Sequence, residues 1–347
     1  MSWWPRRLGL VTRFLDAPGT LADSYGRVAT DLRVSLTDRC NLRCNYCMPA
    51  EGLDWLPTSD VLTDDEVVRL IEIAVVQLGV TQVRFTGGEP LIRRGFTDIV
   101  ARTAKLRPRP QMAVTTNGLG LDKVAGALAA AGLDRVNVSL DTVRRETFKA
   151  ITRRDRFDDV VEGLAAAADA GLTPVKVNAV LLRGHNHDQG PELLRWCLER
   201  GYALRFIEQM PLDAQHAWSR ELMITAEEIL ASLRTEFVLT DHPDERGSAP
   251  AELFLVDGGP ATVGVIASVT RPFCGDCDRV RLTADGQVRN CLFAREESDL
   301  RGALRAGASD DEIAARWRLA MQSKRPGHGI DDESFLQPVR PMSAIGG

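Results

Sequence analysis

The sequence predicts an α/β protein: a partial, open TIM-like barrel of six strand–helix units, followed by a smaller C-terminal α+β extension. Two observations lead to this prediction. A strand-then-helix rhythm repeats six times, and polar residues cluster where the predicted strands end. Strands that alternate with single helices form right-handed βαβ units with parallel strands, whose reactive groups gather at the carboxyl ends of the strands. Six units are too few to close an eight-stranded barrel.

The six units follow one another along the chain. The predicted strands are the short apolar runs at residues 32–37, 80–86, 112–116, 135–140, 174–180 and 203–207. The predicted helices lie at residues 63–78, 94–106, 121–131, 157–170, 190–200 and 224–234. The first helix begins with Thr63-Asp-Asp-Glu66, a capping box in which the Thr hydroxyl and the Glu carboxylate satisfy free backbone N–H groups.

Three parts of the chain are expected. Residues 1–25 are basic up to Asp16, and their apolar run is too short for a secretory signal. This favours a flexible extension over an organellar transit peptide. Residues 26–236 hold the barrel. Residues 237–347 form a C-terminal domain in which Pro and Gly mark irregular structure, with short strands near 252–256 and 262–266.

Composition excludes several classes of protein. The 347 residues carry 43 Lys and Arg against 48 Asp and Glu, so the net charge is −5. This balance argues against nucleic-acid or membrane adhesion. No apolar run approaches the ~18 residues that a membrane span needs. Six of the seven cysteines fall in two groups, which predicts metal binding in a reducing compartment, here the cytoplasm.

The first group follows the first predicted strand, with Cys40, Cys44 and Cys47 at C-x3-C-x2-C spacing. A [4Fe–4S] cluster ordinarily takes four thiolates, one per iron. Three thiolates with no fourth ligand nearby would leave one iron open to a small molecule. The alternative is a zinc knot that borrows a distant ligand, although zinc ligands usually come as two C-x2–4-C pairs.

The second group is Cys274, Cys277 and Cys291, again three without a fourth. It predicts a second cluster with an open iron, which would bind substrate; the alternative is a zinc site completed by His242 or His328. Between these cysteines, Arg279 and Arg281 alternate along an extended segment, which puts both guanidinium groups on one face. Two such groups suit a bidentate grip on phosphate or carboxylate.

Polar residues also stand at the ends of the other predicted strands, or directly after them, and on the fifth strand they lie within it. They are Gly87-Gly88-Glu89-Pro90, Thr115-Thr116-Asn117-Gly118, Ser139-Leu-Asp141, Lys176-Val-Asn178 and Glu208-Gln209-Met210. Each alone fits an ordinary turn or helix cap. Because parallel strands end at one edge of the sheet, together they favour an enzyme active site.

Three other patterns carry no function. Gly118-Leu-Gly120 fails the dinucleotide fingerprint because Lys123 stands where the third glycine is needed, and no P-loop sequence exists. His185-Asn-His187 fits a solvated loop better than a metal site. Cys197 lies among apolar neighbours on a predicted helix, as a buried free thiol does.

The first cysteine group, with Tyr46 before its last cysteine, resembles the signature of radical S-adenosylmethionine (radical SAM) enzymes. From about Gly26 to Gly347 the sequence further resembles the GTP 3′,8-cyclases, which begin molybdenum cofactor biosynthesis. The matching segments are residues 31–44, 83–91, 171–178, the second cysteine group and the ending 341–347.

The resemblance implies a mechanism. A cluster on Cys40, Cys44 and Cys47 would bind SAM and cleave it by one-electron transfer to a 5′-deoxyadenosyl radical. That radical would abstract H3′ of GTP, and C3′ would then attack C8. Reduction would give (8S)-3′,8-cyclo-7,8-dihydroguanosine 5′-triphosphate. The second [4Fe–4S] cluster would contact the guanine.

The resemblance also assigns residues. SAM would contact Tyr46, Gly88, Ser139 and Met210. GTP would contact Arg33, Arg84, Thr115, Lys176, Arg279, Val280 and Arg281. Residues with a direct part in catalysis would be Arg279, Arg281, Gly346 and Gly347. The Gly-Gly tail would enter the active site, whereas its plain alternative is a frayed terminus.

One position departs from the family, because Gln82 stands where many members carry a lysine. The resemblance further implies an external electron donor, cyclic pyranopterin monophosphate synthase as the next enzyme, and a homodimer. Two other functions compete with it: a radical SAM peptide-modifying enzyme with an auxiliary cluster, and a zinc-stabilised binding module without chemistry.

Overall fold

The computed structural model describes residues 19–346 of the chain. Within this range, one sheet of twelve strands runs in the order β12-β11-β10-β1-β2-β3-β4-β5-β6-β9-β8-β7. The strands are β1 (Asp31–Ser35), β2 (Gln82–Thr86), β3 (Gln111–Thr116), β4 (Arg135–Ser139), β5 (Lys176–Val180), β6 (Ala203–Ile207), β7 (Leu239–Asp241), β8 (Glu252–Val256), β9 (Thr262–Ile266), β10 (Arg279–Leu282), β11 (Gln287–Arg289) and β12 (Ser298–Asp299). All pairs from β10 to β9 are parallel, and the outer pairs are antiparallel.

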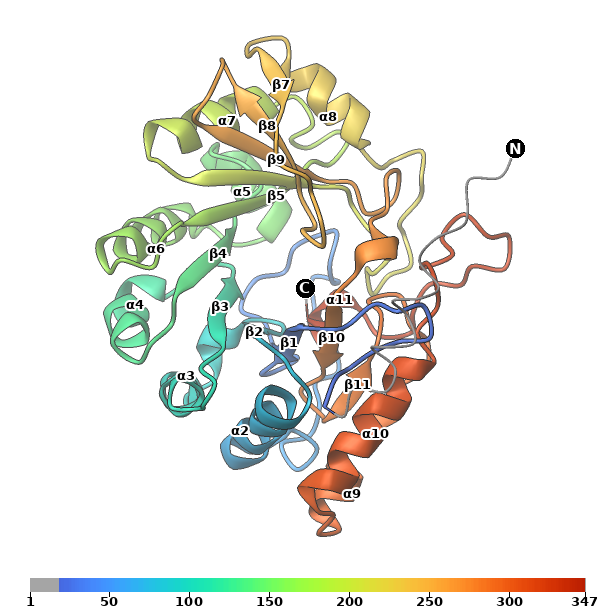
Figure 1. Cartoon of the computed structure of the whole chain (residues 1–347). Helices are drawn as coiled ribbons and strands as arrows, with labels where there is room; N and C mark the ends of the chain where they lie inside the picture. Colours follow the sequence, from blue (N-terminus) through green and yellow to red (C-terminus); the bar gives the residue numbers. More distant parts are fainter. Residues whose placement is uncertain (1–18, 347) are drawn as a thin grey trace.

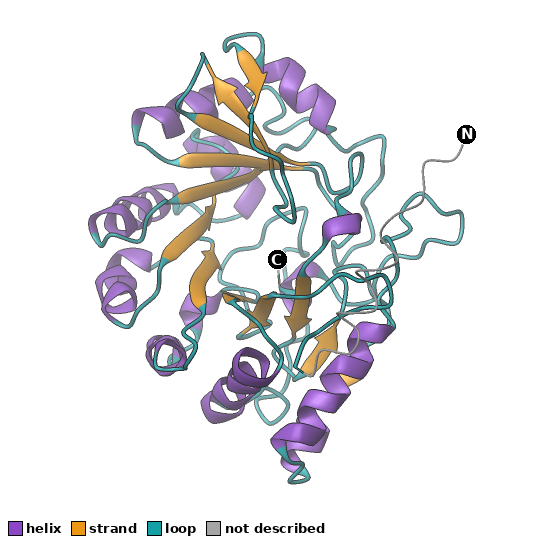
Figure 2. Cartoon of the chain, viewed as in Figure 1, coloured by secondary structure: helices purple, strands orange, loops and turns teal. Residues whose placement is uncertain are grey.

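The strands curve into an open ring with helices on its outside (Figures 1 and 2). The α-helices are α2 (Asp64–Glu72), α3 (Phe96–Ala104), α4 (Leu121–Ala130), α5 (Arg145–Thr152), α6 (Phe157–Asp169), α7 (Gly190–Glu199), α8 (Ala226–Leu233), α9 (Arg301–Arg305), α10 (Asp310–Gln322) and α11 (Met342–Ile345). Short turns of helix lie at η1 (Ile73–Gln77), η2 (Pro90–Ile92) and η3 (Cys274–Asp276). The short α11 lies inside the ring.

The predicted parallel α/β architecture is confirmed, with all six strand–helix units in their expected order. The capping box forms as predicted: Thr63 Oγ1 accepts from the Glu66 N–H, and the Glu66 carboxylate accepts from the Thr63 N–H. The helix predicted over 63–78 ends earlier, at Glu72, and continues as the wider π-helical turn η1. Helix α5 was not predicted.

The C-terminal part of the chain extends the barrel on both sides. Strand β9 pairs in parallel with β6, and β10 pairs in parallel with β1. A sheet of six strands alone would expose a row of unpaired backbone groups at each edge. The segment after residue 236 covers both edges, so the sheet continues across the boundary expected there.

Side-chain alternation gives the sheet two faces. On β1, the fully buried Leu32 and Val34 belong to the core packed under the helices. Arg33, between them, faces the inside of the ring, where it lines a cavity. Successive residues of a strand point to opposite sides. An apolar outer face therefore holds the helices, at about 1.5–3 kcal/mol per large buried side chain, and a polar inner face remains for chemistry.

The described chain is folded before the boundary expected at residue 26. Leu21 and Asp23 are fully buried, and Asp23 forms an ion pair with Arg27. The remainder of the predicted extension, residues 1–18, lies outside the described residues. Within the described range, no helix is long and apolar enough to cross a membrane.

Candidate active site

A row of arginines crosses three neighbouring strands on the inner face of the ring. Arg281 of β10 pairs with Arg33 of β1, and Arg33 pairs with Arg84 of β2. Like charges placed directly opposite each other destabilise a sheet. Three adjacent guanidinium groups in one register therefore oppose folding, and an anion at this position would relieve their repulsion.

These arginines open onto a cavity inside the ring. Of the residues assigned by resemblance, those that line it are Arg33, Tyr46, Cys47, Arg84, Thr115, Ser139, Met210, Arg279 and Arg281. Gly88, Lys176, Val280, Gly346 and the other cysteines of the two groups lie outside this lining as the structure describes it. One cavity thus joins residues beside both cysteine groups with residues from eight strands of the sheet.

Asp31 lies among the arginines but does not neutralise them. Its carboxylate is 3.5 Å from Arg84, 3.9 Å from Arg33 and 4.0 Å from Arg279. Burial raises the pKa of Asp31, but the surrounding arginines outweigh burial and leave that pKa below its usual value. The Nε atoms of all three arginines are buried without a hydrogen-bond partner. Buried donors without hydrogen-bond partners are costly, and the single Asp31 carboxylate is shared by three guanidinium groups, so this end of the cavity is suited to a polyanion.

Two further cations stand next to this row. Arg205 of β6 is buried and donates to Asn178 and Asn137, both at 2.9 Å, and burial with Arg84 and Arg135 lowers its pKa to about 9. Burial, with Arg205, Arg135 and Arg84, lowers the pKa of Lys176 to about 8. Sequence reasoning did not select Arg205, although an arginine within the apolar run Ala203-Leu-Arg-Phe-Ile207 was a usable signal.

The first cysteine loop follows β1 and is held from both sides. Arg43 donates to the carbonyl of Cys40 at 2.7 Å, and Arg153 donates to the carbonyls of Arg43 and Met48, both at 3.0 Å. Gly88 has a steric role here, because a Cβ at this residue would lie 2.2 Å from the Arg39 carbonyl oxygen. The Gly-Gly turn and the cysteine loop are therefore packed backbone to backbone.

The three thiols of this loop suit an iron–sulfur cluster. Cys40, Cys44 and Cys47 are free and half-buried. Burial, Asp141 and the neighbouring cysteines raise the pKa of Cys44 well above its usual value, and burial with Cys40 raises the pKa of Cys47 to about 12. Thiols that disfavour one another's ionisation in this way form one group, and a bound metal removes the penalty by taking them as thiolates.

The second cysteine group lies on η3 and after β11. Burial raises the pKa of Cys277, but Lys324 and Arg279 outweigh burial and leave it below its usual value. His328 does not offer a zinc ligand: its Nε2 meets the Ser268 carbonyl at 3.0 Å, and its Nδ1 accepts from the Ile330 N–H at 3.1 Å. Among the described residues, no three His, Cys, Asp or Glu side chains are arranged for a single metal ion. A [4Fe–4S] cluster takes one thiolate per iron, so its ligands need not meet at one point.

Comparison with known proteins identifies the family. The Radical SAM superfamily model matches residues 34–197, and the Molybdenum Cofactor Synthesis C model matches residues 202–330. A GTP 3′,8-cyclase of Streptomyces coelicolor is 70% identical over 94% of this chain and 96% of that protein. The chain belongs to the GTP 3′,8-cyclase family. It is therefore a radical SAM enzyme of molybdenum cofactor synthesis, with SAM and [4Fe–4S] clusters as its cofactors.

Other relatives agree with this family. GTP 3′,8-cyclase 2 of Mycobacterium tuberculosis strain H37Rv is 62% identical over 96% of this chain and 94% of that protein. Among solved structures, Streptococcus suis SuiB bound to S-adenosylmethionine matches 84% of this chain and 69% of SuiB. The TM-score is 0.56 and the identity 13%, so this likeness concerns the fold alone.

The C-terminal tail of this family member is anchored inside the ring. Ser35 Oγ on β1 donates to the Ile345 carbonyl at 2.9 Å, and the Met342 N–H donates to the Leu212 carbonyl at 2.9 Å. Gly346 has φ 86°, and a Cβ there would lie 2.3 Å from Ser35 Oγ, so glycine is needed at this close approach. Gly347 lies outside the described residues.

The cavity wall beside the first cysteine loop is acidic. The Tyr46 hydroxyl donates to Asp141 at 2.9 Å, and the same carboxylate accepts from the Val180 N–H at 2.8 Å. Burial raises the pKa of Asp141 to about 6. Ser139 and Met210 complete this wall.

Proposed function

We propose that this chain cyclises GTP in the cavity between its two cysteine groups. The row Arg281–Arg33–Arg84 carries the proposal, because it faces a cavity that Cys47 also lines. A nucleoside triphosphate has the charge that the row needs, and Cys47 belongs to the group expected to carry the SAM cluster. The two substrates of a radical cyclisation would then meet in one enclosed space.

Cys40, Cys44 and Cys47 would hold the cluster that binds SAM. When bound, cluster and SAM together supply the 5′-deoxyadenosyl radical that removes H3′ from GTP. Tyr46, Ser139 and Met210 line the cavity where SAM would lie, and Asp141 provides a carboxylate beside its positive charges. Gly88 would offer SAM its backbone carbonyl, because its N–H already donates to the Thr37 carbonyl at 2.7 Å.

Arg33, Arg84, Arg279 and Arg281 would hold the triphosphate. Their guanidinium groups can form paired hydrogen bonds with phosphate oxygens, which relieves their mutual repulsion. Lys176 and Arg205 would add charge on the β5–β6 side, while Thr115 and Val280 would contact the nucleotide. Cys274, Cys277 and Cys291 would hold the second cluster, whose open iron meets the guanine.

The tail and the partners complete the proposal. Arg281 Nε lies 3.4 Å from the Gly346 carbonyl, so the tail and the arginine row would act together at the substrate. Gly346 and Gly347 would assist hydrogen abstraction. An external donor would supply electrons, and cyclic pyranopterin monophosphate synthase would use the product. We expect a cytoplasmic homodimer.

Anaerobic reconstitution tests this function. The reconstituted protein is assayed for iron, then incubated with SAM, a reductant and GTP. We expect about eight irons per chain, formation of 5′-deoxyadenosine and conversion of GTP to a cyclised product. About four irons with 5′-deoxyadenosine but unchanged GTP would contradict the substrate and the second cluster. Zinc in place of iron would contradict both metal sites.

A further inference from the structure

Lys324, two residues after α10, is a buried lysine whose ammonium has no described carboxylate partner. Only 3% of the residue is exposed. Its Nζ lies 3.0 Å from the Arg279 carbonyl, 3.2 Å from the Cys277 carbonyl and 3.5 Å from Cys277 Sγ. Lysine is almost never fully buried unless it is paired with a charge. The sulfur of Cys277 is the one group of these three that can carry negative charge.

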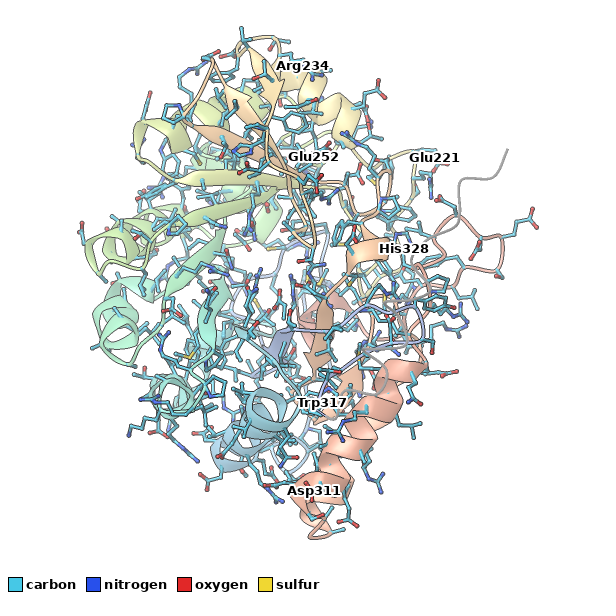
Figure 3. All side chains as sticks on the ribbon, in the orientation of Figure 1. Glu221, Arg234, Glu252, Asp311, Trp317 and His328 are labelled. Atoms are coloured by element: carbon cyan, nitrogen blue, oxygen red, sulfur yellow. The ribbon has the colours of Figure 1, made fainter. Side chains whose placement is uncertain are left out.

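The segment that contains Lys324 encloses the second cysteine group. Arg27 donates to the Cys274 carbonyl at 2.7 Å, and to the Arg325 and Pro326 carbonyls at 2.6 and 2.9 Å. The backbone of His328, which Figure 3 labels beside η3, hydrogen bonds to Cys274. Arg27 is itself neutralised by Asp23. Lys324 therefore remains as an uncompensated charge in this enclosure.

Arg279 does not take over the role of Lys324. Its Nη1 lies 3.8 Å from Cys277 Sγ, but its guanidinium also approaches Asp278 at 3.6 Å and Asp31 at 4.0 Å. Arg279 also lines the cavity, where substrate would engage it. Lys324 approaches the same sulfur while bonded to the backbone carbonyls behind it.

A cluster on three thiolates carries net negative charge, and this charge grows by one unit on reduction. An isolated buried ammonium is strongly destabilising. Burying the negative charge of the cluster is also unfavourable. Each of the two buried charges offsets the cost of the other if the cluster is the counter-ion of Lys324. Net charge and hydrogen bonds to sulfur are among the factors that set the reduction potential of such clusters.

We infer that Lys324 is the charge-balancing residue of the second iron–sulfur site: its ammonium holds the Cys277 thiolate and raises the reduction potential of the cluster. This inference rests on the proposed function, which assigns a cluster to Cys274, Cys277 and Cys291. Lys324 does not touch the cavity as described, so it is a positioning residue that acts through Cys277.

A purely structural role makes a different prediction. The bonds from Lys324 to the Cys277 and Arg279 carbonyls also fasten the end of α10 to β10. If fastening were its whole purpose, the loss of its charge would change stability and leave the potential of the cluster unchanged. The midpoint potential of the cluster distinguishes the two roles. If Lys324 acts through packing alone, the potential should not depend on whether the substituted residue carries a positive charge.

The test uses the full chain with Cys40, Cys44 and Cys47 replaced by Ser, so that the second cluster titrates alone. Lys324→Met removes the charge at similar length, Lys324→Arg keeps it, and Lys123→Met on the exposed face of α4 is the matched control. Midpoints are measured by anaerobic potentiometric titration followed by electron paramagnetic resonance. We expect Lys324→Met to make the cluster at least tenfold harder to reduce, a shift of about 59 mV for one electron. The midpoint potentials of Lys324→Arg and Lys123→Met should remain near that of the parent chain.

Iron content separates the possible failures. About four irons in the parent chain are required; their absence would overturn the second cluster and this inference together. Four irons with the same midpoint in Lys324→Met and parent would overturn the inference alone. If Lys324→Met loses its iron but Lys324→Arg retains it, the charge role is supported. Loss of iron in both variants would overturn it in favour of packing.

Discussion

The two cysteine groups provide the same number of thiols in opposite electrostatic surroundings. Near the first group stand Glu89 and Asp141, which add to the effect of burial in raising the pKa values of Cys40 and Cys44. A neutral amide donates to this group, since Asn117 Nδ2 lies 3.7 Å from Cys40 Sγ. The second group faces the cations Lys324 and Arg279. An equal number of cysteine ligands therefore does not mean equal sites.

This difference matches the ligands expected at the two ends of the cavity, one beside the first cysteine group and one beside the second. SAM carries a sulfonium and an ammonium group, which favour the end with carboxylates. GTP carries a triphosphate, which favours the end with arginines. A cavity with one acidic and one basic end orients two oppositely charged molecules by charge alone. The basic end is the costly one when empty, because its buried guanidinium Nε groups then lack hydrogen-bond partners.

The largest effect is expected from removing one cysteine of either group. Cys44→Ser should abolish both 5′-deoxyadenosine and product, because SAM loses its cluster. Cys277→Ser should retain reductive SAM cleavage and lose cyclisation, by more than the roughly 10–100-fold that outer-shell changes cost. Both products are measured by chromatography after anaerobic incubation. If Cys277→Ser also failed to form 5′-deoxyadenosine, the two ends would not act separately.

Removing one arginine of the row should weaken GTP binding and leave SAM binding unchanged. A hydrogen bond to a charged group contributes about 1.5–3 kcal/mol, so Arg281→Ala should raise the Kd for GTP roughly 10–150-fold. Calorimetry with each ligand measures this. Arg234→Ala on the outside, labelled in Figure 3, is the matched control. Equal weakening of SAM and GTP by Arg281→Ala would contradict the division into two ends.

GTP binding should also depend on pH through Lys176. The pKa of Lys176 in the free protein is lowered to about 8, so its charge is present below pH 8 and lost above it. A bound triphosphate raises this pKa again, so binding takes up a proton in alkaline solution. From pH 7 to 9 the affinity of the native chain should therefore fall, by up to about tenfold per unit above pH 8.

Two variants isolate this contribution. Lys176→Met has no charge to lose, and Lys176→Arg keeps its charge throughout the range, so both should show a flatter dependence than the native chain. Their absolute affinities should differ, with Lys176→Met the weaker. A native profile that is flat from pH 7 to 9 would remove Lys176 from the phosphate site.

The barrel units and the cysteine loops could be predicted because their signals are local. A strand such as Asp31–Ser35 shows its two faces by alternation, and Thr63 to Glu66 mark a helix start within four residues. The cysteine spacings likewise lie within short segments. Local periodicity and spacing were sufficient for these features.

The electrostatic design could not be predicted in the same way. The pairing of β10 with β1 brings Arg281 beside Arg33 from opposite ends of the chain, and no local pattern encodes that register. In the sequence, Lys324 is an ordinary lysine just after a helix, and nothing near it indicates that it is buried against Cys277. Charges that act as a group need the tertiary structure to bring them together.

The smallest effect is expected from a single hydrogen bond at the acidic end. Tyr46→Phe removes the hydroxyl that donates to Asp141 at 2.9 Å and leaves the ring in place. This bond partly offsets the rise that burial causes in the pKa of Asp141, so its loss leaves less negative charge beside SAM. A loss of about 1 kcal/mol at this carboxylate should weaken SAM affinity roughly fivefold, while GTP affinity and iron content remain unchanged. Calorimetry with SAM and GTP, after iron counting, measures all three. An unchanged SAM affinity would show that Tyr46 acts through its ring alone, whereas a loss of GTP affinity would show that the hydroxyl couples the two ends.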